Sequence, residues 1–545
     1  MKKKTLLWLL TVSMTATLLA GCGGGGSSDE TASKAAVSGE DGPAVPYTDT
    51  LTLSLLYEND AGIVYPEGDG PSDNVVTRFM KDKLNIAFDM SWTVDKGNYA
   101  EQLDLAIASN TRLPDVFKVN KRQMSTLASA DLIYDMGELF EKYASDNLKK
   151  VLAFNDNEGI KSATIDGKLY GLPLTNDVGD GVSMIFIRKD WLDTLGLQVP
   201  STLHELIDVA KAFVDQNVSG KPNGTMGIGM AKDLGFTWDV IANAYGGYPD
   251  LWREGADGRL AYGSTLPEIK DGLACLRELY ASGLINSEFA AQETSKLAQY
   301  VAQGRLGIFI GPFWYNNNYI INNFNADPDA DWIVVNNLPL EQGGSVATRA
   351  WNTTYRWWCV SKKCPNPEAA VKLMNLWYEM WQGEYSDWYW DLQMSDEYED
   401  VDMKTYSPVF FDPPLKNCEL DRKLLDALES GDTSNLNAEG MNAYSHLTLD
   451  DGSPINRSSI LTWKGSFRIL NDTYDSFVYD AYRGPTDIQF SAIQSVLDEL
   501  ETNTFIDIIM GKKDVSYFDT FVEEWYSQGG TELTERVNEW YENNR

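Results

Sequence analysis

Polar side chains follow the predicted strands of the first part of the chain, at the points where those strands end. Parallel strands bring their carboxyl ends to one edge of a sheet, where a ligand crevice usually forms. Carboxylate and amide groups at such an edge predict a site for a polar ligand, although a solvated loop or a helix cap is the alternative at each position. These candidates are Glu58, Asn59, Asn120, Asn176 and Asp177.

Local motifs for catalysis or metal binding are not found in the sequence. It has only two histidines, His204 and His446, and neither has a nearby Cys or His to complete a zinc site. G-x-S-x-G, HExxH and Walker A motifs do not occur in the sequence. The sequence therefore predicts no catalytic residue, no metal and no cofactor. A pair of cleft carboxylates among the 80 Asp and Glu residues leaves a glycoside-active enzyme as an open alternative.

Strands and helices alternate in the elements that would position these residues. Leu51, Leu53 and Leu55 alternate with polar residues and predict a first strand, which a helix beginning near Ser72 and Asp73 follows. The alternation continues with strands near 86–90 and 113–117, and the second half is more helical. This order predicts an α/β fold with a largely parallel sheet, and roughly 500 residues after the leader predict two lobes.

Composition limits the class of ligand. The formal net charge is −35, which excludes nucleic acid as a partner, because such binding depends on Lys and Arg. The same charge disfavours polyanionic ligands unless a local Arg overrides it. The four cysteines after residue 22 are too few for a disulfide scaffold and are expected to be small buried hydrophobes, with a Cys359–Cys364 pair as the alternative.

The N-terminus has the features of an export signal. Three lysines precede an apolar stretch at 6–19 that is too short for an ordinary transmembrane helix. It ends in Leu-Ala-Gly-Cys at 19–22, which resembles the bacterial lipobox, so residues 1–21 are expected to be a signal peptide and Cys22 the lipidated residue. An ordinary signal with an incidental cysteine is the alternative. Residues 22–48 are small, polar and Pro-punctuated, and predict a disordered tether.

Several segments together resemble the family 1 extracellular solute-binding proteins, and in particular their long Gram-positive lipoproteins. The segments are IDGKLYGLPL (165–174), SMIFIRKDWLDTLGLQVPSTLHELIDVAKAF (183–213), DGRLAYGSTLPEIKDGLACLRELYASGLINSEF (257–289), GRLGIFIGPFWYN (304–316) and FDTFVEEWYSQGGTELTERVNEWY (518–541). The resemblance implies a periplasmic-binding-protein-like fold, with two α/β lobes joined by a multi-strand hinge and the ligand cleft between them. It also implies a monomer on the outer face of the cell membrane that captures a sugar, as an oligosaccharide, and delivers it to ABC permease subunits.

Aromatic residues become candidates through this resemblance, because a flat ring covers the apolar face of a pyranose while polar groups bond its hydroxyls. Phe313, Trp314 and Tyr315 follow a strand and the turn Gly311-Pro312, so they are expected at a strand end. Trp238 and Asp239 are expected in a loop before a helix, with a contact at the helix start as the alternative, and Arg356 is expected where the chain returns through the hinge. Trp388 is expected in a cleft wall, with the core as the alternative, and Trp463 lies in an apolar stretch. A binding protein of the same fold for a peptide or another non-sugar solute is the alternative function.

The resemblance also divides the chain into lobes. Lobe one is expected at about 49–175 with a segment near 335–400, and lobe two at about 180–330 with much of 400–545. Some relatives carry a calcium loop resembling an EF-hand, and the corresponding stretch here is 214–229. Asp215, Asn217 and Asn223 are too sparse for the spaced oxygen ligands that calcium needs, and Lys221 lies among them. No metal is therefore expected there.

Overall fold

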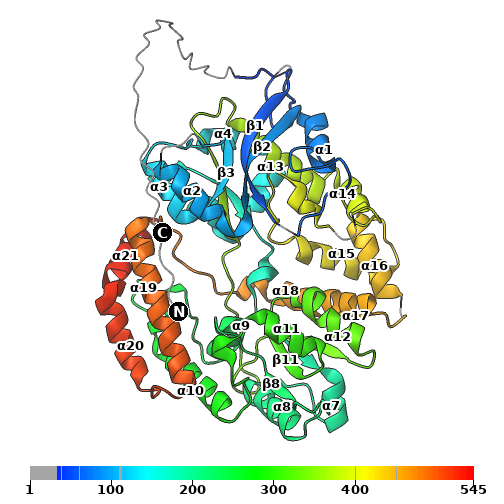
Figure 1. Cartoon of the computed structure of the whole chain (residues 1–545), viewed down its shortest axis with the longest axis vertical. Helices are drawn as coiled ribbons and strands as arrows, with labels where there is room; N and C mark the ends of the chain where they lie inside the picture. Colours follow the sequence, from blue (N-terminus) through cyan, green and yellow to red (C-terminus); the bar gives the residue numbers. More distant parts are fainter. Residues whose placement is uncertain are drawn as a thin grey trace, which may run out of the picture. The chain divides into compact units, whose positions relative to one another are not determined.

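The computed structural model describes residues 34–37, 40–60, 62–109, 113–398, 401–449 and 451–544. From Ala35 onward the chain has two α/β lobes, each built on its own sheet (Figure 1). The expected signal peptide and the expected lipidation site Cys22 lie outside the described residues. Within the described part, no helix combines the length and the apolarity that crossing a membrane requires.

Lobe one contains a five-stranded sheet with the order β2-β1-β3-β13-β6. The strands β1, β3 and β6 run parallel, and β13 runs antiparallel between β3 and β6. Leu51, Leu53 and Leu55 of β1 are buried, so the alternation that predicted this strand is confirmed. The strands are β1 Leu51–Asn59, β2 Ile86–Asp95, β3 Val116–Val119, β6 Leu172–Thr175 and β13 Thr354–Val360.

Helices from two distant parts of the sequence cover this sheet. They share one core with it, in which Phe117, Trp377 and Tyr389 are among the largest buried side chains. The N-terminal group is α1 Val75–Leu84, α2 Tyr99–Ala108, α3 Lys121–Ser129, α4 Gly137–Tyr143, α5 Asp146–Leu152 and α6 Phe154–Ser162. The later group is α13 Glu368–Trp381 and α14 Ser386–Gln393.

Lobe two contains a four-stranded sheet with the order β12-β7-β11-β8, in which β11 and β8 are parallel. Thr202 caps α8 by accepting from Glu205 N. The strands are β7 Met184–Arg188, β8 Met226–Ile228, β11 Leu306–Gly311 and β12 Trp332–Val335. The helices of this part are α7 Lys189–Leu195, α8 Leu203–Asp215, α9 Gly235–Ala244, α10 Pro267–Ala281, α11 Thr294–Ala302 and α12 Ile321–Ala326. A hairpin of β9 Trp252–Glu254 and β10 Leu260–Tyr262 follows α9.

The C-terminal third packs on lobe two. Phe467 and Leu470 share a core with Met184, Phe186 and Phe309. The long helix α19 and the two helices after it join the core around α9 and α10. These elements are α15 Lys416–Ser430, α16 Ala438–Thr448, α17 Pro454–Ile460, α18 Phe467–Thr473, α19 Ile488–Ile509, α20 Tyr517–Trp525 and α21 Thr531–Asn544.

Several segments cross between the two sheets side by side. The first leads from β6 to β7 through the 3-10 helix η2 Val178–Gly181, and another leads from β12 to β13. Residues 412–414 run beside the first, because Asp412 N donates to Thr175 O at 2.8 Å and Val178 N donates to Pro414 O at 2.8 Å. Ala350 forms an antiparallel β-bridge with Val182, and its backbone N–H donates to the Val478 carbonyl at 3.0 Å. These crossings form the hinge.

Part of the expected tether is instead folded against lobe one. Tyr47 is buried, and the Lys372 ammonium of α13 bonds Asp41 at 2.8 Å and the carbonyl of Val45 at 2.9 Å. The expectation of disorder up to residue 48 is therefore wrong for residues 40–48. Composition missed this because the anchoring partners are distant in the sequence: Tyr143, which bonds Asp41, lies 102 residues away and Lys372 lies 331 residues away.

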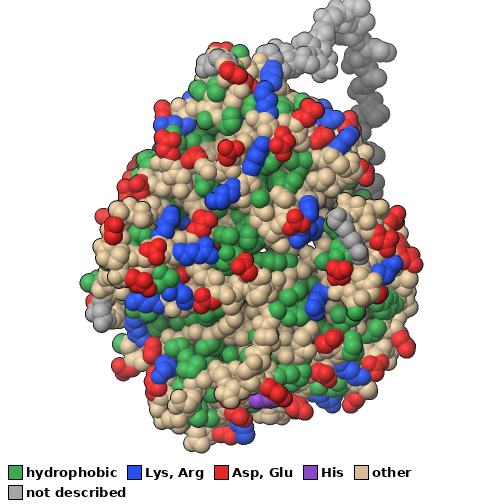
Figure 2. All heavy atoms as spheres, turned by 180° about the vertical axis from the view of Figure 1, so that it is seen from behind, with side chains coloured by type: hydrophobic (Ala, Val, Ile, Leu, Met, Phe, Trp, Pro, Cys, Tyr) green, Lys and Arg blue, Asp and Glu red, His purple; other side chains and the backbone are tan. Residues whose placement is uncertain are grey.

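The four cysteines after residue 22 are buried, as the sequence analysis expected. Cys275, Cys359, Cys364 and Cys418 are free and buried, so Cys359 and Cys364 do not pair. On the face shown in Figure 2, acidic and basic side chains are interspersed over the surface.

Candidate functional site

Three predicted residues meet at one edge of the lobe-one sheet. The carboxyl ends of β1, β3 and β6 lie at this edge together with the start of β13, and they enclose a cavity of about 440 Å³. Glu58, Asn176 and Arg356 all line it. Glu58 and Asn176 follow parallel strands, as the parallel-sheet argument predicted, whereas Arg356 lies about 300 residues from Glu58 on the antiparallel strand β13.

The floor of this cavity is a charged group of three residues. The Lys118 ammonium contacts the Glu58 carboxylate, and Arg356 Nη1 lies 3.3 Å from both of its oxygens. Burial raises the pKa of Glu58, but the two cations outweigh burial and hold that pKa below its ordinary value. Burial lowers the pKa of Lys118, against the opposing effect of Glu58. The side chains of Glu58 and Lys118 are 11% and 10% exposed, whereas Arg356 is 34% exposed and faces the cavity.

Aromatic rings surround the lysine of this floor. Its ammonium lies 5.4 Å from the centre of the Tyr99 ring and 5.7 Å from those of Trp358 and Phe410. Tyr99 also accepts from Lys118 N at 2.9 Å and donates to its carbonyl at 3.2 Å. Lys118 is therefore fixed on several sides, which makes it a rigid partner for Glu58.

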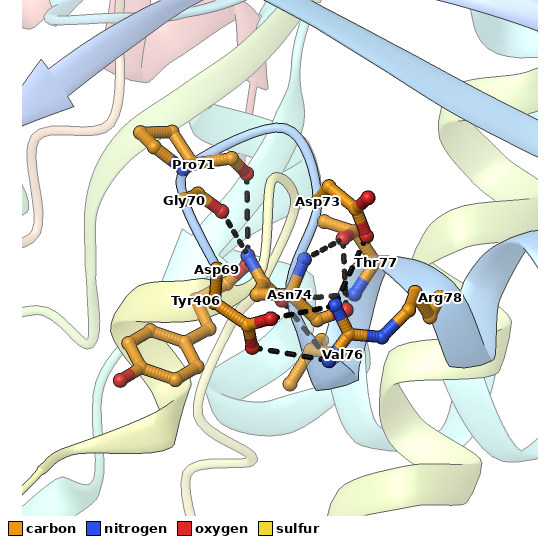
Figure 3. Close-up of polar contacts among 9 residues, drawn as sticks. All are labelled: Asp69, Gly70, Pro71, Asp73, Asn74, Val76, Thr77, Arg78 and Tyr406. Atoms are coloured by element: carbon orange, nitrogen blue, oxygen red, sulfur yellow. Dashed lines mark hydrogen bonds and ion pairs between the residues drawn. The ribbon is translucent and has the colours of Figure 1, made fainter. Parts of the chain in front are cut away.

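The outer wall of the cavity comes from the loops at 60–63 and 402–410, and Asn74 joins the loops behind it (Figure 3). The Asn74 side chain caps α1 by accepting from Val76 N and Thr77 N at 3.0 Å, and it donates to the carbonyls of Gly70, Pro71 and Tyr406. The cap is thus Asn74, not Ser72 or Asp73 as expected. This buried amide ties the start of α1 to the wall of the site.

Tyr406 and Arg78 also hold the loop before α1 in place. The Tyr406 ring stacks on Tyr65 at 4.7 Å, and its hydroxyl donates to the carbonyl of Val64. Arg78 holds Asp69 through two bonds of 2.7 and 3.0 Å. Within the wall, Lys404 bonds Asp412 at 2.9 Å.

The segment 351–358 extends the site beyond this cavity. Tyr355 and Arg356 line the first cavity, and Asn352, Thr354 and Trp357 line a second one of about 230 Å³. Trp351 lines a third of about 90 Å³ at the lobe-two sheet. Trp351 is 50% exposed and Tyr355 is 44% exposed, unusually high values for large rings within a hinge.

The second cavity is polar and receives residues from both lobes. Lys121 of α3 lies 5.1 Å from the Tyr482 ring, and burial lowers the pKa of this lysine to about 8. Burial raises the pKa of Asp480 to about 6, and that of Glu158 is also raised by burial. The Asn352 Oδ1 and Thr354 Oγ1 atoms have no hydrogen-bond partner among the described residues. Unpaired buried oxygens in a polar cavity favour a hydrogen-bonding ligand.

The third cavity lies where β11 ends, and rings dominate it. Trp351 stacks on Phe236 at 5.3 Å, and Phe236 meets Tyr315 edge-on at 6.1 Å. A Cβ at Gly181 would lie 2.5 Å from the Trp351 Cβ, so a glycine is needed there for Trp351 to sit against the hinge. Tyr315 itself is buried and stacks on Phe309 at 4.7 Å.

Phe313 and Trp314 are half-buried beside this cavity rather than in its lining. Phe313 packs on Phe467 at 4.8 Å, and Trp314 packs edge-on against Tyr315 at 4.7 Å. Trp463 packs on the other side of Phe467 at 4.6 Å. These rings form one group behind the lobe-two edge.

The remaining predicted residues do not line these three cavities. Trp238 and Asp239 lie inside α9 rather than in a loop before it. Trp238 packs edge-on against Phe505 in the core, and Asp239 bonds the buried Arg349 of the hinge at 3.1 Å. Burial raises the pKa of Asp239 to about 6, although Arg349 opposes the shift.

Helix caps account for two more of them, as the sequence alternative allowed. Asn120 caps α3 by accepting from Gln123 N at 2.9 Å, and Asp177 accepts from Gly179 N at 2.9 Å. Asn59 ends β1 beside the first cavity without lining it. Trp388 stacks on Phe79 of α1 at 4.0 Å and belongs to the lobe-one core region.

Sequence reasoning missed Lys118, Lys121, Trp351, Tyr355 and Lys404. A signal existed for Lys118, because a lysine inside the apolar strand Val-Phe-Lys-Val needs a buried partner. Trp351 and Lys404 carry no such signal, since they lie in irregular segments.

The loop at 214–229 does not fit a calcium ion. Arg305 donates from Nη2 to the Asn223 carbonyl at 2.9 Å and from Nε to the Gly224 carbonyl at 3.3 Å. Two backbone carbonyls of this loop thus already accept from a guanidinium. Among the described residues, no group of three His, Cys, Asp or Glu side chains is placed to hold a metal.

Two α/β lobes with a crevice at the hinge define a solute-binding protein. Residues 66–380 match the family described as bacterial extracellular solute-binding protein, and the chain belongs to that family. The polygalacturonan/rhamnogalacturonan-binding protein YtcQ of Bacillus subtilis (strain 168) is 30% identical over 250 residues, which span 44% of this chain and 47% of that protein. The chain thus spans about half the length of that relative.

Two further comparisons cover nearly whole chains. The lipoprotein LipO of the same organism is 23% identical over 100% of this chain and 99% of its own length. The solved structure of the Streptococcus pneumoniae ABC-transporter substrate-binding protein FusA with kestose has a TM-score of 0.60 at 15% identity, covering 91% of this chain and 100% of that one. At this identity the structural match supports the fold alone.

Proposed function

We propose that the chain is the extracytoplasmic substrate-binding component of an ABC importer, which captures an oligosaccharide and delivers it to a membrane permease. Membership of the solute-binding family supports the class, and the names of two relatives support a sugar as the ligand: YtcQ, and the fructooligosaccharide-binding FusA, which is 27% identical over 343 residues. The protein binds its ligand and does not transform it.

The observation that carries this proposal is the segment 351–358, which lines all three cavities. It exposes the rings of Trp351 and Tyr355 between charged groups on lobe one and rings on lobe two. A pyranose has an apolar face and a hydroxyl edge, so it matches alternating rings and polar groups. Three cavities along one segment favour a ligand of several sugar units over a single one.

Capture occurs by closure about the hinge. A ligand on the lobe-one floor also reaches Trp351 and Phe236, so it bonds both lobes and stabilises the closed arrangement. The permease then binds the closed form and releases the sugar by favouring the open one. The three adjacent crossing segments allow such a rotation without breaking either core.

A lipid on Cys22 holds the monomer at the outer face of the membrane. Labelled palmitate is expected to enter the wild-type protein and not the Cys22→Ser variant. Equal labelling of both proteins would place the lipid on another residue, and no labelling of either would show that the chain has no lipid anchor.

The binding proposal is tested by a thermal-shift panel of mono- and oligosaccharides, peptides and other solutes, because a ligand that binds only the folded state raises the Tm. We expect a rise with an oligosaccharide that Trp351→Ala abolishes. A rise with peptides alone would make this a non-sugar binding protein. Chromatography of the incubated glycan is expected to return it unchanged, and any cleavage product would establish an enzyme.

A further inference from the structure

The lobe-one cavity is more basic than the rest of the chain. Its lining has four basic residues, Lys96, Lys118, Arg356 and Lys404, and three acidic ones, Glu58, Asp60 and Asp402. The whole chain has 45 basic and 80 acidic residues. Because Lys404 is paired with Asp412 at 2.9 Å, the uncompensated positive charge of the site lies with Lys118 and Arg356.

The excess positive charge lies on the floor. Glu58 is a single carboxylate between two cations, Lys118 and Arg356. At the rim, Lys96 pairs with Asp60 at 3.0 Å, and both of these side chains are largely exposed. Glu58 and Lys118 are nearly buried and Arg356 is 34% exposed, so the floor charges are screened less than those at the rim. One positive charge on the floor consequently has no carboxylate of its own.

Arg356 is the cation with capacity for another partner. Its contacts with Glu58 involve Nη1 alone and are long, at 3.3 Å, whereas strong N–H to carboxylate bonds are about 2.7–2.9 Å. The hydrogen bonds of the described residues give its Nε and Nη2 no partner. A planar fork of two N–H groups matches the two oxygens of a carboxylate.

The neighbouring rings place a sugar beside this fork. Tyr355 precedes Arg356 in β13 and is 44% exposed, and Trp358 lines the same cavity. A neutral sugar would leave the excess charge to be solvated by water, whereas an acidic one would neutralise it. The net charge of −35 repels an anion at long range, but screening over about 8–10 Å leaves the local charge to decide.

We propose that this floor selects an acidic sugar, with Arg356 and Lys118 binding the carboxylate of a uronate unit. This inference depends on the proposed function, because it names the class of sugar that the same crevice takes. It narrows the ligand from oligosaccharides in general to those that carry uronic acids.

The test compares each acid with its own methyl ester, which keeps the ring and hydroxyls and removes the charge. Trimers of galacturonate, glucuronate and mannuronate, their esters and a sulfated trisaccharide are titrated by calorimetry into the purified protein. We expect at least one acid to bind 10- to 100-fold more tightly than its ester, with affinity falling as salt rises. Arg356→Met should abolish this preference, and Arg356→Lys should retain part of it.

Lys211→Met is the control, since this lysine of α8 is 61% exposed, pairs with Asp215 and lines none of the three cavities. Its preference for the acid should stay within about twofold of wild type, and circular dichroism should show all variants folded. Equal binding of acid and ester, binding of neutral glycans alone, or preference for the sulfated sugar would each overturn the uronate assignment and leave sugar capture standing. Binding of no sugar at all would overturn the proposed function itself.

Discussion

The two sheets meet the crevice with opposite chemistry. The lobe-one edge carries Glu58, which both Lys118 and Arg356 bond. The lobe-two edge carries rings, with Phe236 stacked on the half-exposed Trp351. The charged groups are therefore partners in the folded protein before any ligand arrives, whereas the Trp351 ring has one face free.

Substitutions at the two edges should therefore affect folding stability and ligand affinity differently. Removal of a buried ion partner leaves another charge without compensation, so lobe-one substitutions should weaken folding and binding together. Removal of a ring with an exposed face costs folding little, so lobe-two substitutions should weaken binding alone. The predictions below test this separation.

Glu58→Leu should have the largest effect. It leaves Lys118 and Arg356 without a carboxylate and should lower the free energy of unfolding by about 3–5 kcal/mol. Urea unfolding measures the change. The double variant Glu58→Leu/Lys118→Met should recover much of the loss, because it also removes the lysine's buried charge. A loss below about 1 kcal/mol in the single variant would show that this group is solvated and not part of the core.

Trp351→Ala should lower ligand affinity by about 2 kcal/mol, roughly 30-fold, with little change in Tm. The reason is that the lost ring covers one sugar face but is half exposed in the free protein. Trp388→Ala is the matched control, because that ring stacks on Phe79 away from the cavities and should lower the Tm without changing affinity. The opposite pattern for the two tryptophans would place the ligand at α14.

Much of the fold could be predicted from local patterns. The alternation at Leu51–Leu55 gave β1, and the order of strands and helices gave the α/β class. The parallel-sheet rule also brought Glu58 and Asn176 to one edge. Arg356 joined them from a strand that neighbours β3 only in space, and there the prediction depended on the resemblance to known proteins.

The rest could not be predicted because it depends on contacts between distant segments. Residues 40–48 have a polar, Pro-containing sequence typical of a tether, yet Lys372 needs Asp41 as the partner of its buried charge. Asn120 and Asp177 have the residue type of a ligand contact and also of a helix cap, and only the backbone around them shows that they cap. A tryptophan such as Trp238 is typical of both the core and a sugar cleft, and only its contact with Phe505 shows that it belongs to the core.

Asp180 provides a smaller effect that depends on pH. Burial and then Asp412 raise the pKa of this hinge carboxyl from 3.8 to about 7, with Lys404 opposing. Its contribution to stability is thus fully present below about pH 4 and is lost as the pH rises through 7. Asp180→Asn should match wild type at pH 4 and exceed it by roughly 1–3 kcal/mol at pH 8.5. Parallel stability curves for the two proteins over this range would contradict the assignment.

Tyr355→Phe should have the smallest effect, because it removes a single hydroxyl from the lobe-one edge. Burial raises the pKa of Tyr355 to about 12, so its phenol is protonated and can donate to a sugar oxygen at any physiological pH. Loss of one such bond should cost about 0.5–1.5 kcal/mol, a 2- to 10-fold loss of affinity, without loss of stability. Tyr57→Phe is the control in the same cavity, because the Tyr57 hydroxyl already bonds Tyr65 at 2.6 Å. If both phenylalanine variants lose the same affinity, the hydroxyl of Tyr355 is not a ligand contact and the lobe-one edge acts through its charges alone.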